Sequence, residues 1–355
     1  MTRAERVVAR FPEKELDLLL VTDLTNVRYL TGFTGTNAMA VIGPDLRRFV
    51  TDFRYVEQAG HEVDGFEVER GPQDFMTALA EGWPPGELRL GFDDGHVTVR
   101  AHRRLREVVP ERIELVPAGG LVEAERAVKE PGEIERIRAA AALADDIYAW
   151  VEEQGLVGRT EREVALALEH EMRLRGAEDP SFPSIVAAAD NGALPHATPR
   201  DVPIPAGTLV TLDLGCRLDG YCSDCTRTWA TGELPDALAE IHALVLRAQE
   251  TALAAVRAGP TGEEIDAVAR EIIAAAGHGD HFGHGLGHGV GLEVHEAPRL
   301  SPTGTDALVA GNVVTVEPGV YVPGLSGARI EDLVVVTEDG CDVLSGAPKA
   351  LRTVG

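Results

Sequence analysis

The sequence predicts a two-domain protein of mixed α/β class. At 355 residues the chain is longer than one typical hydrophobic core supports. Hydrophobic residues make up 44% of it, which is enough for a sizeable core and argues against disorder. The first third alternates short apolar runs with helical patterns, and a long helical pattern begins at Pro131. We therefore place one domain over residues 1–122 and a second over residues 123–355.

Short apolar runs followed by turn residues predict the strands of the first domain, at 16–23, 38–43, 47–52 and 88–94. Helical patterns lie between them at 53–60 and 75–81. This alternation predicts a compact α/β domain that ends near Gly120.

Repeated helix starts organise the second domain. Pro131 stands at the entry to the long helical pattern, where its missing N–H costs nothing. Thr160 and Thr261 each begin a Thr-x-x-Glu capping box, within the similar segments 158–164 and 259–265. The similarity predicts two related α/β halves with an active site at their seam, although two capping boxes also arise by chance.

The composition excludes several classes of function. A net charge of −25 repels phosphate backbones, so no nucleic-acid partner is expected. No apolar run is long enough to span a bilayer, and the N-terminus lacks a signal-peptide core, so we expect a cytoplasmic protein without a membrane partner. Four unevenly spread cysteines do not predict a disulfide framework, and we interpret the Cys222 and Cys225 pair as core residues.

Two aspartates interrupt a predicted hairpin. The segment VTLDLGCRLDGYCSDCTRTW predicts a strand over 209–216, a turn over 217–220 and a return strand. Asp213 lies in the first strand and Asp224 in the second, and both break apolar patterns. A buried carboxylate is costly unless it is paired or binds a metal, so a salt-bridged pair and a metal site are both open here.

Further candidate ligands follow along the chain. A glycine-rich segment carries four histidines: His281, His284, His288 and His295. Alternating glycines let the backbone approach a ligand closely. Glu317 ends one buried strand pattern in NVVTVEPGVYV, and Glu331 begins another in GARIEDLVVV.

The donor set predicts a metal centre. Four carboxylates cannot share a site unless cations neutralise them. Two divalent ions per chain, roughly 3.5–4 Å apart, would do so and would hold a bridging water that attacks a carbonyl. An oxygen-rich shell with one imidazole favours manganese, with cobalt and zinc as the alternatives.

At these residues the chain resembles the pita-bread metallopeptidases, the family of methionine aminopeptidase, aminopeptidase P, prolidase and creatinase. The motifs DLG, GHGVGLEVHE, VEPG and RIED carry the resemblance, in the order Asp213, Asp224, His288, Glu317 and Glu331. The N-terminal NVRYLTGFTGTNAMAVIG resembles the extra domain of creatinase, prolidase and aminopeptidase P. The resemblance implies a pita-bread catalytic domain preceded by a smaller creatinase-like α/β domain.

The resemblance also implies ligand roles. Asp213 would chelate one metal ion, and His288 with Glu317 would hold the other. Asp224 and Glu331 would bridge both ions. Glu317 would in addition handle the proton of the attacking water.

Substrate contacts are implied in the same way. His284 and His295 would contact the substrate and stabilise the developing oxyanion. His196 matches another histidine of the family pocket. Tyr321 and Arg329 match supporting groups of the proline-specific branch.

The implied activity is hydrolysis of Xaa-Pro bonds at the N-terminus of short peptides. A dipeptidase must bind the carboxylate directly after proline, and Arg299, four residues after His295, suits a bidentate pair. We therefore favour an Xaa-Pro dipeptidase (prolidase). The alternative is an Xaa-Pro aminopeptidase (aminopeptidase P), in which Arg299 would be an ordinary surface residue. A catalytically inactive binding module would require lost ligands, and all five are present. The N-terminal domain implies a homodimer in which residues near 33–37 reach the partner's site.

Overall fold

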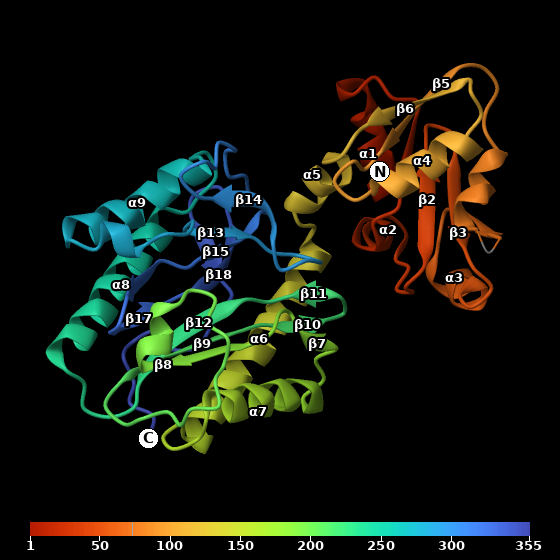
Figure 1. The fold of residues 1–355 in the computed structure, drawn as a ribbon. Helices are drawn as coiled ribbons and strands as arrows, with labels where there is room; N and C mark the ends of the chain where they lie inside the picture. The colour runs from red at the N-terminus through yellow and green to blue at the C-terminus, as the bar shows by residue number, and fades with distance from the viewer. Residues whose placement is uncertain (73) are drawn as a thin grey trace. The chain divides into compact units, whose positions relative to one another are not determined.

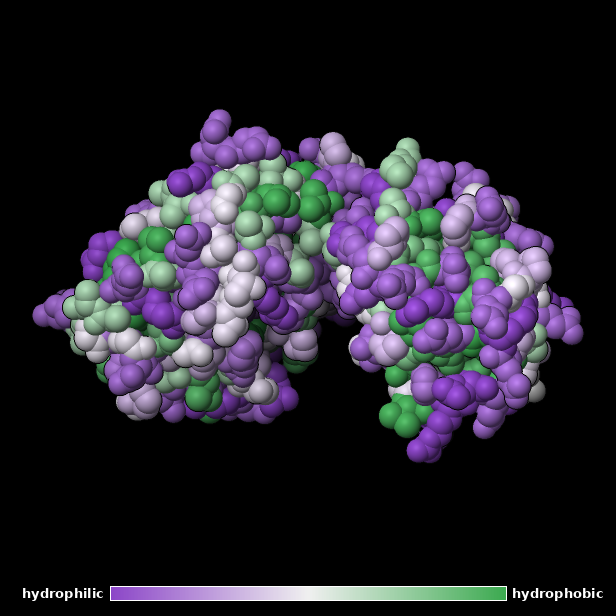
Figure 2. Space-filling model, turned by 90° about the horizontal axis from the view of Figure 1, so that it is seen from above, coloured by the Kyte–Doolittle hydropathy of each residue, from purple (hydrophilic) through white to green (hydrophobic). Residues whose placement is uncertain are grey.

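The computed structural model describes residues 1–72 and 74–355, which form two compact units, Met1–Arg126 and Ala127–Gly355 (Figure 1). Both contain helices and sheets, which confirms the predicted mixed α/β class. The predicted domain boundary after residue 122 falls inside helix α5 (Leu121–Ala127). The face of the molecule in Figure 2 is mainly hydrophilic, with apolar residues scattered between polar ones. Among the described residues no helix is both long and apolar enough to cross a membrane.

The first unit is built on one mixed sheet. Its strand order is β4-β3-β2-β1-β5-β6, with β1, β2 and β3 antiparallel and the outer neighbours parallel. The strands are β1 (Leu18–Val21), β2 (Ala38–Ile42), β3 (Arg47–Thr51), β4 (Glu67–Arg70), β5 (Leu88–Phe92) and β6 (Ile113–Pro117). The helices are α1 (Arg3–Ala9), α2 (Leu24–Thr31), α3 (Val56–Glu62), α4 (Val99–Val108) and α5. The four strands predicted for this unit are confirmed, while the predicted helix at 75–81 is a 3₁₀ helix, Phe75–Ala80.

Two helix pairs flank the strands of the second unit (Figure 1). They are α6 (Pro131–Gln154) with α7 (Glu161–Leu174), and α8 (Asp236–Ala255) with α9 (Gly262–Ala275). The predicted capping boxes at Thr160 and Thr261 are confirmed, and each threonine also forms an isolated antiparallel bridge, to Pro203 and Ala307 respectively. The two halves therefore begin their second helix in the same way, as the sequence similarity predicts.

The strands of the second unit form several small sheets. The site depends on the antiparallel sheet β12-β9-β8 and on the five-stranded sheet β14-β13-β15-β18-β19. The bounds are β7 (Asp179–Pro180), β8 (Ile185–Ala188), β9 (Leu209–Leu214), β10 (Cys216–Leu218), β11 (Tyr221–Cys222), β12 (Cys225–Ala230), β13 (Gly287–Gly289), β14 (Glu296–Leu300), β15 (Val313–Val316), β16 (Gly319–Val322), β17 (Ser326–Arg329), β18 (Asp332–Val336) and β19 (Cys341–Val343).

The predicted hairpin is confirmed in outline and corrected in detail. Its turn lies at Asp219 and Gly220, whose φ angles of 49° and 81° suit the primed turns of hairpins. The return strand is broken, because β11 ends before residues 223 and 224 and β12 begins after them. Asp224 therefore lies in the break and not within a strand as predicted. Side chains of a paired strand alternate between the two faces of the sheet, and a carboxylate in such a break does not have to follow this alternation.

Each helix pair packs on its own core. Apolar residues of α8 and α9 bury against β15, β17 and β18, whereas those of α6 and α7 bury against β8, β9 and β12. Of the cysteines, Cys216, Cys222 and Cys225 are free and buried, in agreement with the interpretation of Cys222 and Cys225 as core residues. The strands that lie between the helix pairs are therefore held rigidly from both sides.

Loss of one helix cap should destabilise the second unit measurably. We expect Thr261→Ala to lower the free energy of unfolding by about 1 kcal/mol, because the Thr261 hydroxyl accepts from the Glu264 N–H at 3.2 Å. Thr251→Ala is the matched control, since this exposed mid-helix threonine bonds only to the Arg247 carbonyl of its own helix. Urea unfolding of both variants checks the prediction, and equal losses would contradict it.

Candidate metal centre

All five predicted ligands line one cavity of about 670 Å³ in the second unit. They reach it from separate segments: Asp213 in β9, Asp224 before β12, His288 in β13, Glu317 directly after β15 and Glu331 directly before β18. The predicted substrate residues His196, His284, His295, Arg299 and Arg329 line the same cavity. Residues up to 135 positions apart in the sequence, from His196 to Glu331, are thus gathered at one place.

The tightest group is Asp224, His288 and Glu331, whose ligand atoms all lie within 4.8 Å of one another. His288 Nε2 lies 3.6 Å from Asp224 Oδ2 and 3.3 Å from Glu317 Oε1. All three members of the group are buried. Their spacing and chemistry suit a divalent cation better than a set of internal hydrogen bonds.

Two buried carboxylate oxygens support the same conclusion. Asp213 Oδ1 and Glu331 Oε1 have no hydrogen-bond partner among residues 1–72 and 74–355. A buried polar atom without a partner carries a desolvation penalty, which a bound cation would remove. The residues present therefore fit a metal centre.

The pKa shifts express the cost of crowding these acids. Burial, and then the neighbouring carboxylates, raise the pKa values of Asp224 and Glu331 well above their usual range. Burial also raises the pKa of Asp213, against the opposing effect of the Arg329 guanidinium. Burial is also the largest effect on Glu317 and acts in the same direction, but the hydrogen bond and charge of His288, together with His284 and Arg329, outweigh it and lower the pKa of Glu317 to about 2. Without cations the four acids cannot all be ionised.

Hydrogen bonds aim the ligands into the cavity. His288 Nδ1 donates to the Gly289 carbonyl at 3.1 Å, which leaves Nε2 facing the carboxylates. The Thr315 hydroxyl accepts from the His288 N–H and donates to Glu317 Oε1. The Nδ1 hydrogen bond selects the imidazole tautomer that a metal requires at Nε2, and Thr315 joins the backbone of His288 to Glu317.

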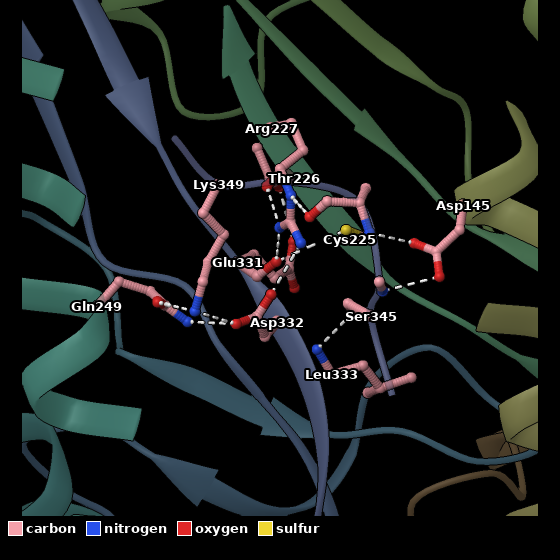
Figure 3. A network of polar contacts seen from close by, with 12 residues as sticks. Asp145, Cys225, Thr226, Arg227, Gln249, Glu331, Asp332, Leu333, Ser345 and Lys349 are labelled. Atoms are coloured by element: carbon pink, nitrogen blue, oxygen red, sulfur yellow. Dashed lines mark hydrogen bonds and ion pairs between the residues drawn. The ribbon is translucent and has the colours of Figure 1, made fainter. Parts of the chain in front are cut away.

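A buried polar network lies behind Glu331 (Figure 3). Arg227 donates to the Glu331 main-chain carbonyl and pairs with Asp332 at 2.8 Å, with both side chains 1% exposed. Lys349 adds a second cation at 2.7 Å from Asp332, and Gln249 donates to the same carboxylate. The network fixes the start of β18, and hence Glu331, against β12.

A second chain of contacts starts at Asp213. Arg329 Nη2 lies 2.6 Å from Asp213 Oδ2, and Arg329 Nη1 donates to the Tyr321 hydroxyl at 2.8 Å. The Tyr321 hydroxyl in turn lies 2.9 Å from His284 Nε2. Tyr321 itself does not line the cavity among the described residues, so it acts through His284 and Arg329.

Three of the predicted substrate residues present more open side chains. His196, His295 and Arg299 are exposed, and the His295 ring packs edge-on against His288 with centroids 4.4 Å apart. His281 does not belong to this group. It lies outside the cavity lining of the described residues and contacts His278, Nδ1 to Nδ1, at 3.0 Å.

Sequence reasoning missed two kinds of residue. Thr226 donates to Glu331 Oε2 at 2.6 Å, and Thr315 orients His288, yet both look like ordinary strand threonines. The apolar cavity wall of Phe182, Pro183 and Ile185 was also missed. The pairing of Ile185 with Asp213 across β8 and β9 places this wall beside the ligands. No local sequence pattern predicts this pairing.

Comparisons with known proteins agree with this geometry. Residues 135–338 match metallopeptidase family M24, and residues 3–128 match the creatinase/prolidase N-terminal domain. The chain is 43% identical to the uncharacterized peptidase YqhT of Bacillus subtilis (strain 168), over 98% of this chain and 99% of that protein. A solved Xaa-Pro dipeptidase from Bacillus anthracis is 39% identical with a TM-score of 0.95, covering 99% of each chain. A solved X-Pro aminopeptidase from Thermotoga maritima MSB8 is 36% identical with a TM-score of 0.91, covering 99% of this chain and 100% of that one.

The crowded acids should lower the stability of the metal-free protein at neutral pH. Because the pKa of Glu331 is raised, the folded state binds an extra proton, and stability falls as pH rises above the ordinary glutamate pKa of about 4. We expect Glu331→Gln to raise the free energy of unfolding at pH 7, because the amide removes the charge that burial and the neighbouring carboxylates disfavour. The gain should shrink toward pH 4.

Chemical unfolding at several pH values in the presence of a chelator measures this difference. The exposed Glu338→Gln is the control and should change nothing. A destabilised Glu331→Gln protein at pH 7 would contradict the predicted electrostatic strain.

Proposed function

The chain belongs to metallopeptidase family M24 and, from that premise, we propose that it is an Xaa-Pro dipeptidase. The observation that carries the proposal is the gathering of four carboxylates, one ligand histidine and Arg299 on a single cavity. The first five groups can hold the metal ions of a metallopeptidase, and a dipeptidase needs a cation for the free carboxylate after proline.

Membership of the family implies divalent metal ions, and we propose two per chain. Asp213 would hold one and His288 with Glu317 the other, while Asp224 and Glu331 would bridge them. Manganese is our proposed metal, with cobalt or zinc as alternatives, because most of the donors are oxygens. When bound, such ions lower the pKa of water and polarise a peptide carbonyl.

Glu317 is the residue that we propose for proton transfer. Its lowered pKa keeps Glu317 ionised at neutral pH, and we propose that this carboxylate takes the proton of the attacking water and later passes it to the leaving proline nitrogen. Its Oε1 already accepts from Thr315, which fixes the carboxylate in the cavity.

We propose that His284 and His295 contact the substrate, with different tasks. Both nitrogens of His284 are engaged, since Nδ1 donates to the Gly285 carbonyl and Nε2 faces the Tyr321 hydroxyl. His295 is exposed to the cavity, so it is the better donor to a developing oxyanion.

Proline is recognised by shape. Its amide nitrogen carries no hydrogen, so the enzyme has no donor to bind there. Phe182, Pro183 and Ile185 offer an apolar wall for the ring, while His196 and Arg299 supply polar contacts at the exposed side.

The second candidate is an Xaa-Pro aminopeptidase that acts on longer peptides. The likeness to the Thermotoga maritima X-Pro aminopeptidase favours it. Arg299 favours the dipeptidase, because a longer peptide presents no carboxylate at that place. A catalytically inactive binding module is the remote alternative.

We further propose a cytoplasmic homodimer. In the loop expected to reach the partner's site, Phe33 is buried against Phe49 and Tyr55, so Thr34 and Thr36 are its exposed members. The side chain of Phe53 in the same unit is 70% exposed and is a candidate contact. Light scattering measures the oligomeric state, and a fully active monomer would refute the dimer.

Metal dependence is the first test of the function. We expect chelation to abolish Xaa-Pro hydrolysis and manganese to restore it. Asp224→Ala should lower the metal content from two ions toward none, because the variant lacks a bridging ligand, whereas His295→Ala should keep both ions and lose most turnover. Elemental analysis beside kinetic assays checks this, and full activity of the metal-stripped protein would refute the proposal.

Substrate choice is the second test. We expect Arg299→Gly to reduce kcat/KM for Xaa-Pro dipeptides. The reduction should correspond to a loss of about 2–4 kcal/mol in transition-state stabilisation, because a charge-assisted pair to the carboxylate is lost. Xaa-Pro-Yaa tripeptides should suffer much less. Equal losses on both substrates would show that Arg299 is structural and would favour the aminopeptidase.

A further inference from the structure

A buried ion pair lies just outside the cavity. Lys129 Nζ is 3.0 Å from Glu296 Oε2, and the two side chains are only 1% and 5% exposed. Glu296 directly follows His295, and Lys129 precedes helix α6. Neither residue lines the cavity in the described chain, and the proposed mechanism uses neither. A buried pair of this kind tolerates the loss of one partner poorly.

The second oxygen of Glu296 fastens the loop that carries His295. Glu296 Oε1 accepts from the Glu293 N–H at 3.1 Å, and the Glu293 carbonyl accepts from the Gly291 N–H at 2.9 Å. The Gly291 carbonyl accepts from Cys222 of β11 at 2.8 Å. One carboxylate thus connects the loop 291–295 to Lys129.

The fit around this carboxylate is close. A Cβ atom at Gly291 would lie 2.6 Å from Glu296 Oε2, so the loop backbone rests directly on the carboxylate. Glycine is needed here for space and not for an unusual φ angle.

Lys129 is itself held in place. Its N–H donates to the Gly311 carbonyl at 2.8 Å, beside the bridge between Val128 and Asn312. The His295 ring, next to Glu296 in the sequence, packs against His288. The loop therefore has two fixed points, one at the proposed metal ligand and one at the ion pair.

We propose that the Lys129–Glu296 ion pair is a positioning device for His295 in the reaction. It holds the loop 291–295 so that the exposed imidazole stays over the cavity while a substrate binds. The inference rests on the proposed function, which gives His295 its role as a donor to the substrate. It assigns a task to Lys129, near the start of the second unit, that the proposed ligand roles do not explain.

The test compares Lys129→Met and Gly291→Ala with wild type. Lys129→Met removes the cation, and Gly291→Ala displaces the carboxylate from the opposite side. Arg138→Met is the matched control, because Arg138 forms only an exposed pair with Glu135 at 3.9 Å. Three quantities are measured: manganese stoichiometry, kcat and KM for alanyl-proline, and hydrogen exchange of residues 291–296 in metal-free protein.

Both variants should keep their manganese, lose about 10- to 100-fold in kcat with little change in KM, and exchange faster only in the loop. The control should match wild type. Unchanged kcat and exchange in Lys129→Met would overturn the inference, and so would loss of manganese together with kcat, which would mark the pair as a general stabiliser. A wild-type protein without Xaa-Pro activity would overturn the proposed function alone, and the exchange data would still decide whether the pair holds the loop.

Discussion

Four buried carboxylates on one cavity form the constraint around which the second unit is arranged. Burial and mutual repulsion both favour protonated acids, and they raise the pKa values of Asp224 and Glu331. Arg329 partly offsets this for Asp213, and His288 does so for Glu317. Glu331 Oε1 has no partner among residues 1–72 and 74–355, so a cation bound there would relieve the electrostatic strain of the metal-free site.

Two neighbouring acids at the start of β18, Glu331 and Asp332, point in opposite directions and have different roles. Adjacent residues of an extended chain point to opposite faces, so Glu331 faces the cavity while Asp332 faces Arg227 and Lys349 (Figure 3). The same Arg227 donates to the Glu331 carbonyl. A functional carboxylate and a structural one are therefore neighbours in sequence, and the ion pairs of the second hold the backbone of the first.

This arrangement explains what the sequence could and could not predict. The capping boxes at Thr160 and Thr261 and the strands around Asp213 and Glu317 follow from local patterns, which the structure confirms. The break at Asp224 does not, because the sequence from Tyr221 to Ala230 predicts one continuous return strand.

Partners far apart in sequence could not be predicted from pattern at all. Tyr321 with His284, Arg227 with Asp332 and Lys129 with Glu296 are each joined by the fold, over separations of 37, 105 and 167 residues. The family resemblance implies candidate site residues, but the fold decides which of them support the others.

The cavity has one rigid side and one adaptable side, and the hydrogen-bond directions show why. His284 Nδ1 must donate to the Gly285 carbonyl, so its Nε2 accepts from the Tyr321 hydroxyl, which leaves the tyrosine oxygen to accept from Arg329. Burial lowers the pKa of His284, which keeps the ring neutral and preserves this order at neutral pH. Every donor in the chain from His284 to Asp213 is thereby committed before a substrate arrives. Among residues 1–72 and 74–355 the side chains of His295 and Arg299 form no hydrogen bond or ion pair, so under the proposed function they are the groups whose donors remain for the substrate.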